Sequence, residues 1–216
     1  MSVDDVWRRI DNHMGVFVKG NYDQVPDGKG VYAWFYPLRV TTKKLDDVIE
    51  EFSKVAHYDA ISKSIPKSSS VVEFNWSNSR ISIKHSIKLK TIAKKVYEAW
   101  NLYKENDELF LELRKSIMSA SLLMPPLYVG KTKSLRTRCM QHVKGEEGDN
   151  SNFHSRYESF AKKHNFSAKE VAELIFVCIR TDYEKYDMEE DGGNMNPHSV
   201  VEAILKAAAR PPYGII

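Results

Sequence analysis

The chain of 216 residues is long enough for one domain with an insertion, or for two small domains. Hydrophobic residues make up 42% of it and charged residues 28%, proportions that exclude a wholly disordered chain. The formal net charge of +3 admits a nucleic acid or another anionic partner without requiring one.

Cysteine content and the N-terminal sequence bear on the compartment. The two cysteines, Cys139 and Cys178, cannot build a disulfide framework. The opening "MSVDDVWRRI" is charged and lacks the apolar core of a secretory signal. Apolar runs stay well short of the roughly 20 residues that span a bilayer. We therefore expect a cytoplasmic protein that does not enter a membrane.

The first strong element follows a polar, amphipathic lead-in over residues 1–29. The sequence "PDGKG" at 26–30 predicts a turn, because it combines proline, aspartate and glycine. The β-branched and aromatic run "VYAWFY" at 31–36 predicts a strand that ends before Pro37.

Residues 37–124 differ in pattern and are expected to form an inserted helix-hairpin-helix module. Apolar residues at helical spacing over 43–56 predict an amphipathic helix. Two β-rich runs around 77–79 predict a hairpin. A long helix is expected from about 92 to 117, with a bend or break at Asn106 and Asp107.

The remaining elements alternate between strand and helix. A short strand is expected at 126–130, followed by a helix that Ser134 caps and that runs to about Lys144. Residues 156–164 predict another helix. The run "ELIFVCIR" at 173–180 predicts a strand that is apolar on both faces, and Asn196-Pro197 opens a helix that extends to about 209.

The motifs in these elements resemble those of the GIY-YIG nuclease family. "GVY" at 30–32 stands for the first family tripeptide and "YVG" at 128–130 for the second. "YVGKTKSLRTRCMQH" matches the family's strand, turn and arginine-bearing helix, with Arg138 and His142 four residues apart. The resemblance covers residues 30–36 and 126–213.

The resemblance implies an α/β fold with a small three-stranded antiparallel sheet flanked by helices. In that sheet the strand at 31–36 should pair with the strand at 126–130. It assigns residues 1–36 and 125–216 to the nuclease domain, which the large, mostly helical insertion interrupts. It also implies Mg²⁺- or Mn²⁺-dependent cleavage of phosphodiester bonds, usually in DNA. The implied site residues are Tyr32, Tyr128, Arg138, His142 and Glu202, with Glu202 as the metal-binding carboxylate. Lys131 contacts either the substrate phosphate or only the turn, and we include it in the site because the turn should lie at its mouth. His154 is a weaker match to a second histidine that some members carry.

These residue types suit phosphodiester hydrolysis. A metal ion on Glu202 would polarise the phosphate and stabilise the leaving oxygen. The planar guanidinium of Arg138 can hold phosphate oxygens. A tyrosine near a metal and cations can have its phenol pKa lowered, which would let it act as a base or orient the water.

Two departures separate the chain from the family pattern. The 37–124 module stands where the family usually has a short loop. Gly214 in "PPYG" stands where the family usually has an asparagine. Glu202 itself falls at the edge of an expected apolar stripe, formed by Val200, Val201, Ile204, Leu205 and Ala208.

Two alternatives remain open at the level of sequence. One is a catalytically inactive module of the same fold that binds nucleic acid, which Gly214 motivates. The other is a nucleotide-binding protein that uses Gly130-Lys131-Thr132, although the glycine that a phosphate loop needs is replaced by Pro125. A restriction or phage-defence role suits a nuclease with an inserted module.

The insertion carries a basic stretch without acidic residues. It contains Lys84, Lys88, Lys90, Lys94 and Lys95 together with His85. The lysines predict either a solvated rim or a surface that contacts DNA phosphates. DNA is the expected partner, RNA is the other nucleic acid that this chemistry admits, and a dimer is compatible with the sequence.

Overall fold

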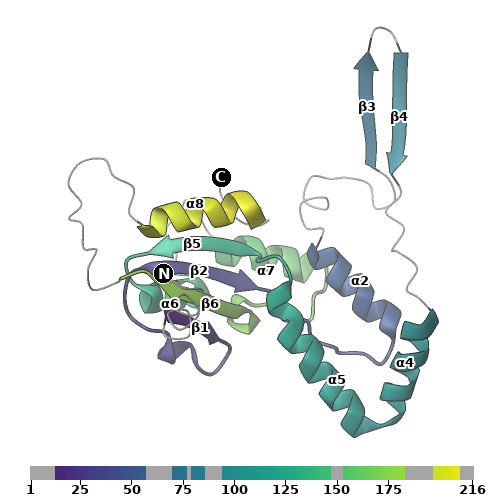
Figure 1. Cartoon of the computed structure of the whole chain (residues 1–216), viewed down its shortest axis with the longest axis horizontal. Helices are drawn as coiled ribbons and strands as arrows, with labels where there is room; N and C mark the ends of the chain where they lie inside the picture. Colours follow the sequence, from purple (N-terminus) through teal and green to yellow (C-terminus); the bar gives the residue numbers. More distant parts are fainter. Residues whose placement is uncertain are drawn as a thin grey trace, which may run out of the picture. The chain divides into compact units, whose positions relative to one another are not determined.

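The computed structural model describes residues 13–56, 70–76, 79–85, 94–146, 153–182 and 197–209 (Figure 1). The chain divides into two compact units, and each is described by itself. One unit combines Met1–Arg39 with Ile117–Ile216, and the other is Val40–Ser116. The second unit falls within the module expected at 37–124.

The first unit is built on one antiparallel sheet in the order β1-β6-β2-β5. Its strands are β1 (Met14–Phe17), β2 (Gly30–Phe35), β5 (Tyr128–Thr132) and β6 (Ile175–Arg180). The α/β class is confirmed, whereas the sheet in the described residues has four strands and not the three expected. The additional strand β1 is four residues long and pairs at the edge with β6.

The predicted pairing between β2 and β5 is confirmed. The two strands are antiparallel, with Tyr32 opposite Gly130 and Trp34 opposite Tyr128. Strand β2 lies between β5 and β6, so both of its edges are hydrogen-bonded. The side chains of Tyr32 and Trp34 are buried, as is expected for large aromatic groups on a central strand.

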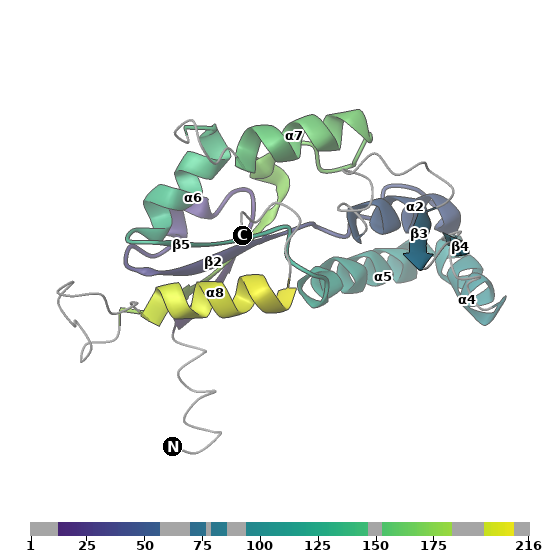
Figure 2. The ribbon, with the colours of Figure 1, turned by 90° about the horizontal axis from the view of Figure 1, so that it is seen from above.

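Helices cover both faces of this sheet. Figure 2 shows α6 and α7 over one face and α8 against the other. The helical elements of the unit are η1 (Tyr22–Gln24), η2 (Ala120–Leu123), α6 (Leu135–Lys144), α7 (Phe153–Lys163), η3 (Val171–Glu173) and α8 (Pro197–Ala209). Because both faces are covered, the first four residues of β6 are buried, which confirms the expectation drawn from its continuous apolar run.

The second unit contains the predicted helices and hairpin. Its elements are α2 (Leu45–Ala56), β3 (Ser70–Trp76), β4 (Ser79–His85), α4 (Lys94–Glu105) and α5 (Asp107–Ser119), the last of which continues past the boundary at Ser116. Strands β3 and β4 pair only with each other in the described residues. The rings of Trp100 and Phe110 meet edge to face at 5.5 Å, and the Trp100 indole donates to the Lys43 carbonyl at 2.9 Å. No helix within the described ranges has the length and apolarity needed to cross a bilayer.

The predicted break in the long helix is present at Asn106. Its side-chain oxygen accepts hydrogen bonds from the backbone N–H groups of Glu108 at 3.0 Å and Leu109 at 3.1 Å. These are two of the orphan donors at the start of α5, so Asn106 acts as the N-cap of that helix.

Replacing Asn106 with alanine should therefore lower the free energy of unfolding by about 1 kcal/mol, because two exposed N–H groups lose their protein acceptor. Asn106→Asp keeps an acceptor at the same place and is the matched control. Chemical denaturation of both variants measures the difference. Equal stability of Asn106→Ala and the wild type would show that the cap contributes nothing.

Candidate functional site

Helix α6 is fixed at its N-terminus by contacts that the turn sequence supplies. The Ser134 hydroxyl accepts a hydrogen bond from the Thr137 N–H at 3.3 Å and donates to the Asp27 carboxylate at 2.7 Å. The Leu135 N–H donates to the Gly28 carbonyl at 3.0 Å. The predicted cap at Ser134 is confirmed, and it joins α6 to the turn that precedes β2.

The apolar stripe of α6 directs two polar side chains toward the sheet. Leu135 and Cys139 are fully buried. Arg138 and His142 lie one turn apart beside that stripe, so both point to the face that carries Tyr32. His142 is fully buried and Arg138 is partly exposed.

The phenol of Tyr32 is the centre of this group. Arg138 Nε donates to the Tyr32 oxygen at 3.2 Å, and His142 Nε2 lies 2.8 Å from the same oxygen. The rings of Tyr32 and Tyr128 stack with their centroids 5.9 Å apart. We refer to Tyr32, Tyr128, Arg138 and His142 as the tyrosine cluster, and the structure brings all four together as the sequence predicted.

The chemistry of the partners fixes the direction of one of the two hydrogen bonds between Tyr32 and α6. A guanidinium can only donate, so the Tyr32 oxygen accepts from Arg138. The direction of the contact with His142 depends on the tautomer: the phenol donates to Nε2 when the imidazole carries its proton on Nδ1, and accepts when the proton is on Nε2. The arrangement runs from guanidinium through phenol to imidazole.

The glycine of the second tripeptide is required by space. A Cβ at Gly130 would lie 2.5 Å from the Tyr32 oxygen and 2.8 Å from Cε1 of Tyr128. Real side chains do not approach so closely. Tyr32 therefore lies across Gly130, and the absence of a side chain there lets the phenol reach α6.

Burial determines the protonation state of Tyr32. Burial raises the phenol pKa well above 10.0, and the neighbouring Tyr128 raises it further, whereas Arg138 lowers it. The burial effect dominates because Tyr32 is only 2% exposed. Tyr32 is therefore neutral near pH 7. The expectation of a lowered phenol pKa concerned a tyrosine beside a metal ion and stays a prediction.

Lys131 and Glu202 form a second group on the other face of the sheet. Lys131 Nζ donates to the Ser199 hydroxyl at 2.8 Å and lies 3.8 Å from Glu202 Oε2. Successive strand residues point to opposite faces, so Lys131 points away from the face that Gly130 and Tyr128 share. Figure 2 agrees, because α8 and α6 lie on opposite sides of the sheet. The sequence placed these residues with the tyrosines, whereas the structure separates them by the thickness of β5.

The side of α8 that faces the sheet overlaps only in part with the predicted apolar stripe, of which Val201 and Leu205 are half-buried. Val200 and Ile204 of the expected apolar stripe are 41% and 61% exposed. Ser199 is buried and the Glu202 side chain is 14% exposed, so these polar residues face the sheet. Glu202 therefore lies inside the interface and not at its edge, because Lys131 supplies a partner there.

Three further residues lie beside the two groups and contact their members. Gln141, three residues after Arg138, accepts from Arg138 Nη1 at 3.2 Å. Ser199 was missed by sequence reasoning, although its spacing of three from Glu202 predicts a shared helix face. His154 Nδ1 donates to the His142 carbonyl at 2.8 Å, so it holds α7 to α6 and lies outside the tyrosine cluster.

Glu202 is a chemically suitable ligand for a magnesium ion. Within the described residues, no group of three or more histidine, cysteine, aspartate or glutamate side chains could hold a metal. Magnesium is commonly bound by one or two carboxylates, with water and substrate phosphates as the other ligands. A single carboxylate such as Glu202 fits that mode of binding, and it does not fit a preformed protein cage.

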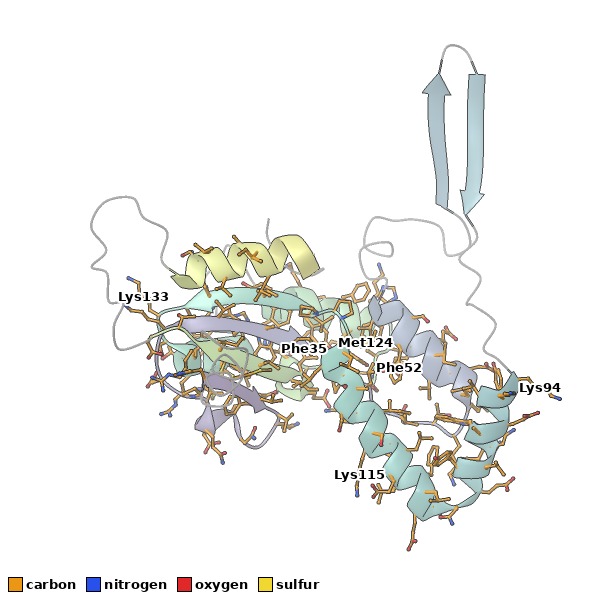
Figure 3. The ribbon with its side chains drawn as sticks, viewed as in Figure 1. Phe35, Phe52, Lys94, Lys115, Met124 and Lys133 are labelled. Atoms are coloured by element: carbon orange, nitrogen blue, oxygen red, sulfur yellow. The ribbon has the colours of Figure 1, made fainter. Side chains whose placement is uncertain are left out.

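Two of the predicted phosphate-contacting lysines lie outside the described residues. Lys84 is on β4 with its side chain undescribed, and Lys88 and Lys90 fall between the described ranges. Lys94 begins α4, where it points outward (Figure 3) and lies 3.5 Å from Glu98. Gly214 is also outside the described residues. The DNA-contacting role of these lysines stays a prediction.

Comparisons of the chain with protein-family models, curated proteins and solved structures give no match. The two groups are therefore interpreted from their own geometry and from the motifs that carry them.

Adding one methyl group at Gly130 should destabilise the fold. Gly130→Ala would force the Tyr32 ring away from α6, at a cost of about 1–3 kcal/mol for overpacking. Gly15→Ala is the matched control, since its Cβ would also lie 2.5 Å from a ring. That ring belongs to Phe17, which is half-buried on edge strand β1 and can rotate away. Urea denaturation compares the two variants, and equal losses would contradict a special role for Gly130.

The raised pKa of Tyr32 predicts an alkaline limit to stability. Because the neutral phenol is favoured in the folded state, its contribution is complete below pH 10 and is lost as pH rises above that value. Wild-type stability should therefore fall more steeply than that of Tyr32→Phe, by up to about 1.4 kcal/mol per pH unit. Burial also raises the pKa of Tyr22, Cys139 and Cys178, but both proteins share these groups. Denaturation curves collected across alkaline pH test this, and parallel curves would contradict it.

Proposed function

We propose that the chain is a metal-dependent endonuclease of the GIY-YIG type that hydrolyses phosphodiester bonds in DNA. The observation that carries the proposal is the Tyr32 phenol, which lies across Gly130 between Arg138 and His142. Under this proposal β6, β2 and β5 are the three family strands, and β1 is an addition at the edge.

Arg138 is the member of the tyrosine cluster best suited to contact the substrate. It is partly exposed, and its guanidinium already donates to Tyr32 and Gln141. A phosphate that approached this fork would meet a fixed positive charge with oriented N–H donors. Arg138 would then contact the scissile phosphate and the Tyr32 phenol at the same time.

Tyr32 and His142 would move a proton. The phenol is neutral and its oxygen lies 2.8 Å from His142 Nε2, which accepts the phenol proton when the imidazole is protonated on Nδ1. In such a relay the Tyr32 oxygen would take a proton from the attacking water. The phenol would at the same time pass its own proton to His142. This relay is general base catalysis that needs no permanent phenolate.

Glu202, through a bound metal ion, and Lys131 would interact with the phosphate from the opposite face of β5. Magnesium held by Glu202 would polarise a phosphate oxygen and stabilise the leaving group. Lys131 is 43% exposed and adds a positive charge beside that carboxylate. Because β5 is an edge strand, a substrate that lies along this edge would meet Arg138 from one face and Lys131 from the other.

The unit at 40–116 would bind the DNA outside the cleavage site. Lys84, Lys88, Lys90 and Lys94 would contact the DNA phosphates, as the basic composition of that stretch suggests. A self-contained binding unit fits a cytoplasmic restriction or defence nuclease, and it would also fit a dimer.

A second candidate is a module that binds nucleic acid without cutting it. One observation favours it: the metal-binding carboxylate pairs with Lys131 on the face opposite the Tyr32 phenol. A site divided in this way would hold phosphates through Arg138 and Lys131 and leave the chemistry incomplete.

Incubation with supercoiled plasmid, with and without Mg²⁺, separates the two functions. We expect Mg²⁺-dependent nicking that Glu202→Gln abolishes and that Arg138→Ala slows by about a hundredfold, the loss typical of removing one oriented donor. Lys144→Ala, which changes an exposed residue on the same helix, is the control and should keep full activity. DNA binding by the wild type without any cleavage would instead support the binding module.

A further inference from the structure

Lys131 is shared between two acceptors on α8. Its ammonium donates to the Ser199 hydroxyl at 2.8 Å and lies 3.8 Å from the Glu202 carboxylate. Ser199 and Glu202 are three residues apart, so one turn of helix presents both acceptors to the same lysine. Ser199 is buried and Glu202 is nearly so, whereas Lys131 reaches them from the more exposed edge strand.

The two distances rank the contacts. The neutral hydroxyl is within hydrogen-bonding distance, whereas the carboxylate is an ion-pair partner beyond that distance. Lys131 can therefore keep its hydrogen bond to Ser199 if Glu202 binds another cation. The lysine would then remain close to that cation, and the two positive charges would repel one another.

We propose that Lys131 and Ser199 regulate the cation affinity of Glu202. Lys131 is the resident counter-ion with which a divalent cation must compete, and Ser199 keeps the lysine beside the carboxylate during that competition. The inference rests on the proposed function, because it takes Glu202 as the carboxylate that binds the metal. It assigns to Ser199 the role of a positioning residue that acts through Lys131.

This arrangement makes cation binding depend on the substrate. Without a phosphate, the cation and Lys131 share one carboxylate, and their repulsion keeps the cation affinity low. A bound phosphate brings negative charge that satisfies both cations. Binding of phosphate and of the divalent cation should therefore each strengthen the other, as thermodynamic linkage requires.

A titration of the full chain with Mn²⁺ alone tests the competition without DNA. The free ion is measured by electron paramagnetic resonance. Lys131→Met removes the charge and keeps the length of the side chain, and it should tighten Mn²⁺ binding roughly threefold to tenfold. Lys133→Met is the matched control. Lys133 is exposed on the turn two residues away (Figure 3) and should have less than half of this effect. Equal tightening by both variants would overturn the proposal, because the effect would be one of overall charge.

The role of Ser199 is tested in the same titration by a double-mutant cycle. Ser199→Ala should tighten Mn²⁺ binding by less than Lys131→Met does, and Ser199→Thr, which keeps the hydroxyl, should restore the wild-type value. In the Lys131→Met background, Ser199→Ala should have no effect, since the residue it positions is gone. An effect of the same size in both backgrounds would overturn the positioning role.

Glu202→Gln distinguishes failure of this inference from failure of the proposed function. Loss of Mn²⁺ binding in Glu202→Gln, with no change in Lys131→Met, would overturn the competition and leave the metal site intact. Mn²⁺ binding that Glu202→Gln leaves unchanged would show that Glu202 is not the ligand, and the metal-dependent function would fall with it. The expected result is loss in Glu202→Gln and tightening in Lys131→Met.

Discussion

The position of Gly130 beneath the Tyr32 phenol is the constraint on which the rest of the first unit depends. Tyr32 stands on the central strand, and its oxygen reaches α6 only because the opposite residue on β5 has no side chain. The contact of the Tyr32 oxygen with α6 therefore depends on the register of the two strands and on the position of His142. The buried aromatic rings around it, including Trp34 and Phe176, then complete the core on the same face.

The sequence predicted the parts of the fold that have strong local signals. The two tripeptides and the continuous apolar run of β6 specified three strands, and the pairing of β2 with β5 followed from the family resemblance. Strand β1 was missed because four residues at a sheet edge, with Met14 and Val16 exposed, give little periodic signal. The orientation of α8 was missed for another reason. Its apolar pattern favoured burial of Val200, but the sheet offers Lys131 as a partner for polar groups, and periodicity does not report such partners.

The long stretch of sequence between β2 and β5 adds little to the entropic cost of pairing the two strands. The entropy of closing a loop rises only with the logarithm of its length, so most of the cost is already present for a short connection. The intervening residues also form a compact unit with contacts of their own, among them the packing of Trp100 on Phe110. An insertion of this kind leaves the paired strands free to keep the geometry of the tyrosine cluster.

Strand β5 is much less tolerant of changes in length than the segment that precedes it. A strand alternates its faces at every residue, so one inserted or deleted residue exchanges the two sides. Such a change between Tyr128 and Lys131 would move the lysine to the face of α6 and away from Ser199 and Glu202. It would also put a side chain where Tyr32 needs an empty position. Variation in chain length should therefore be absorbed between β2 and β5, while the five residues of β5 keep their number.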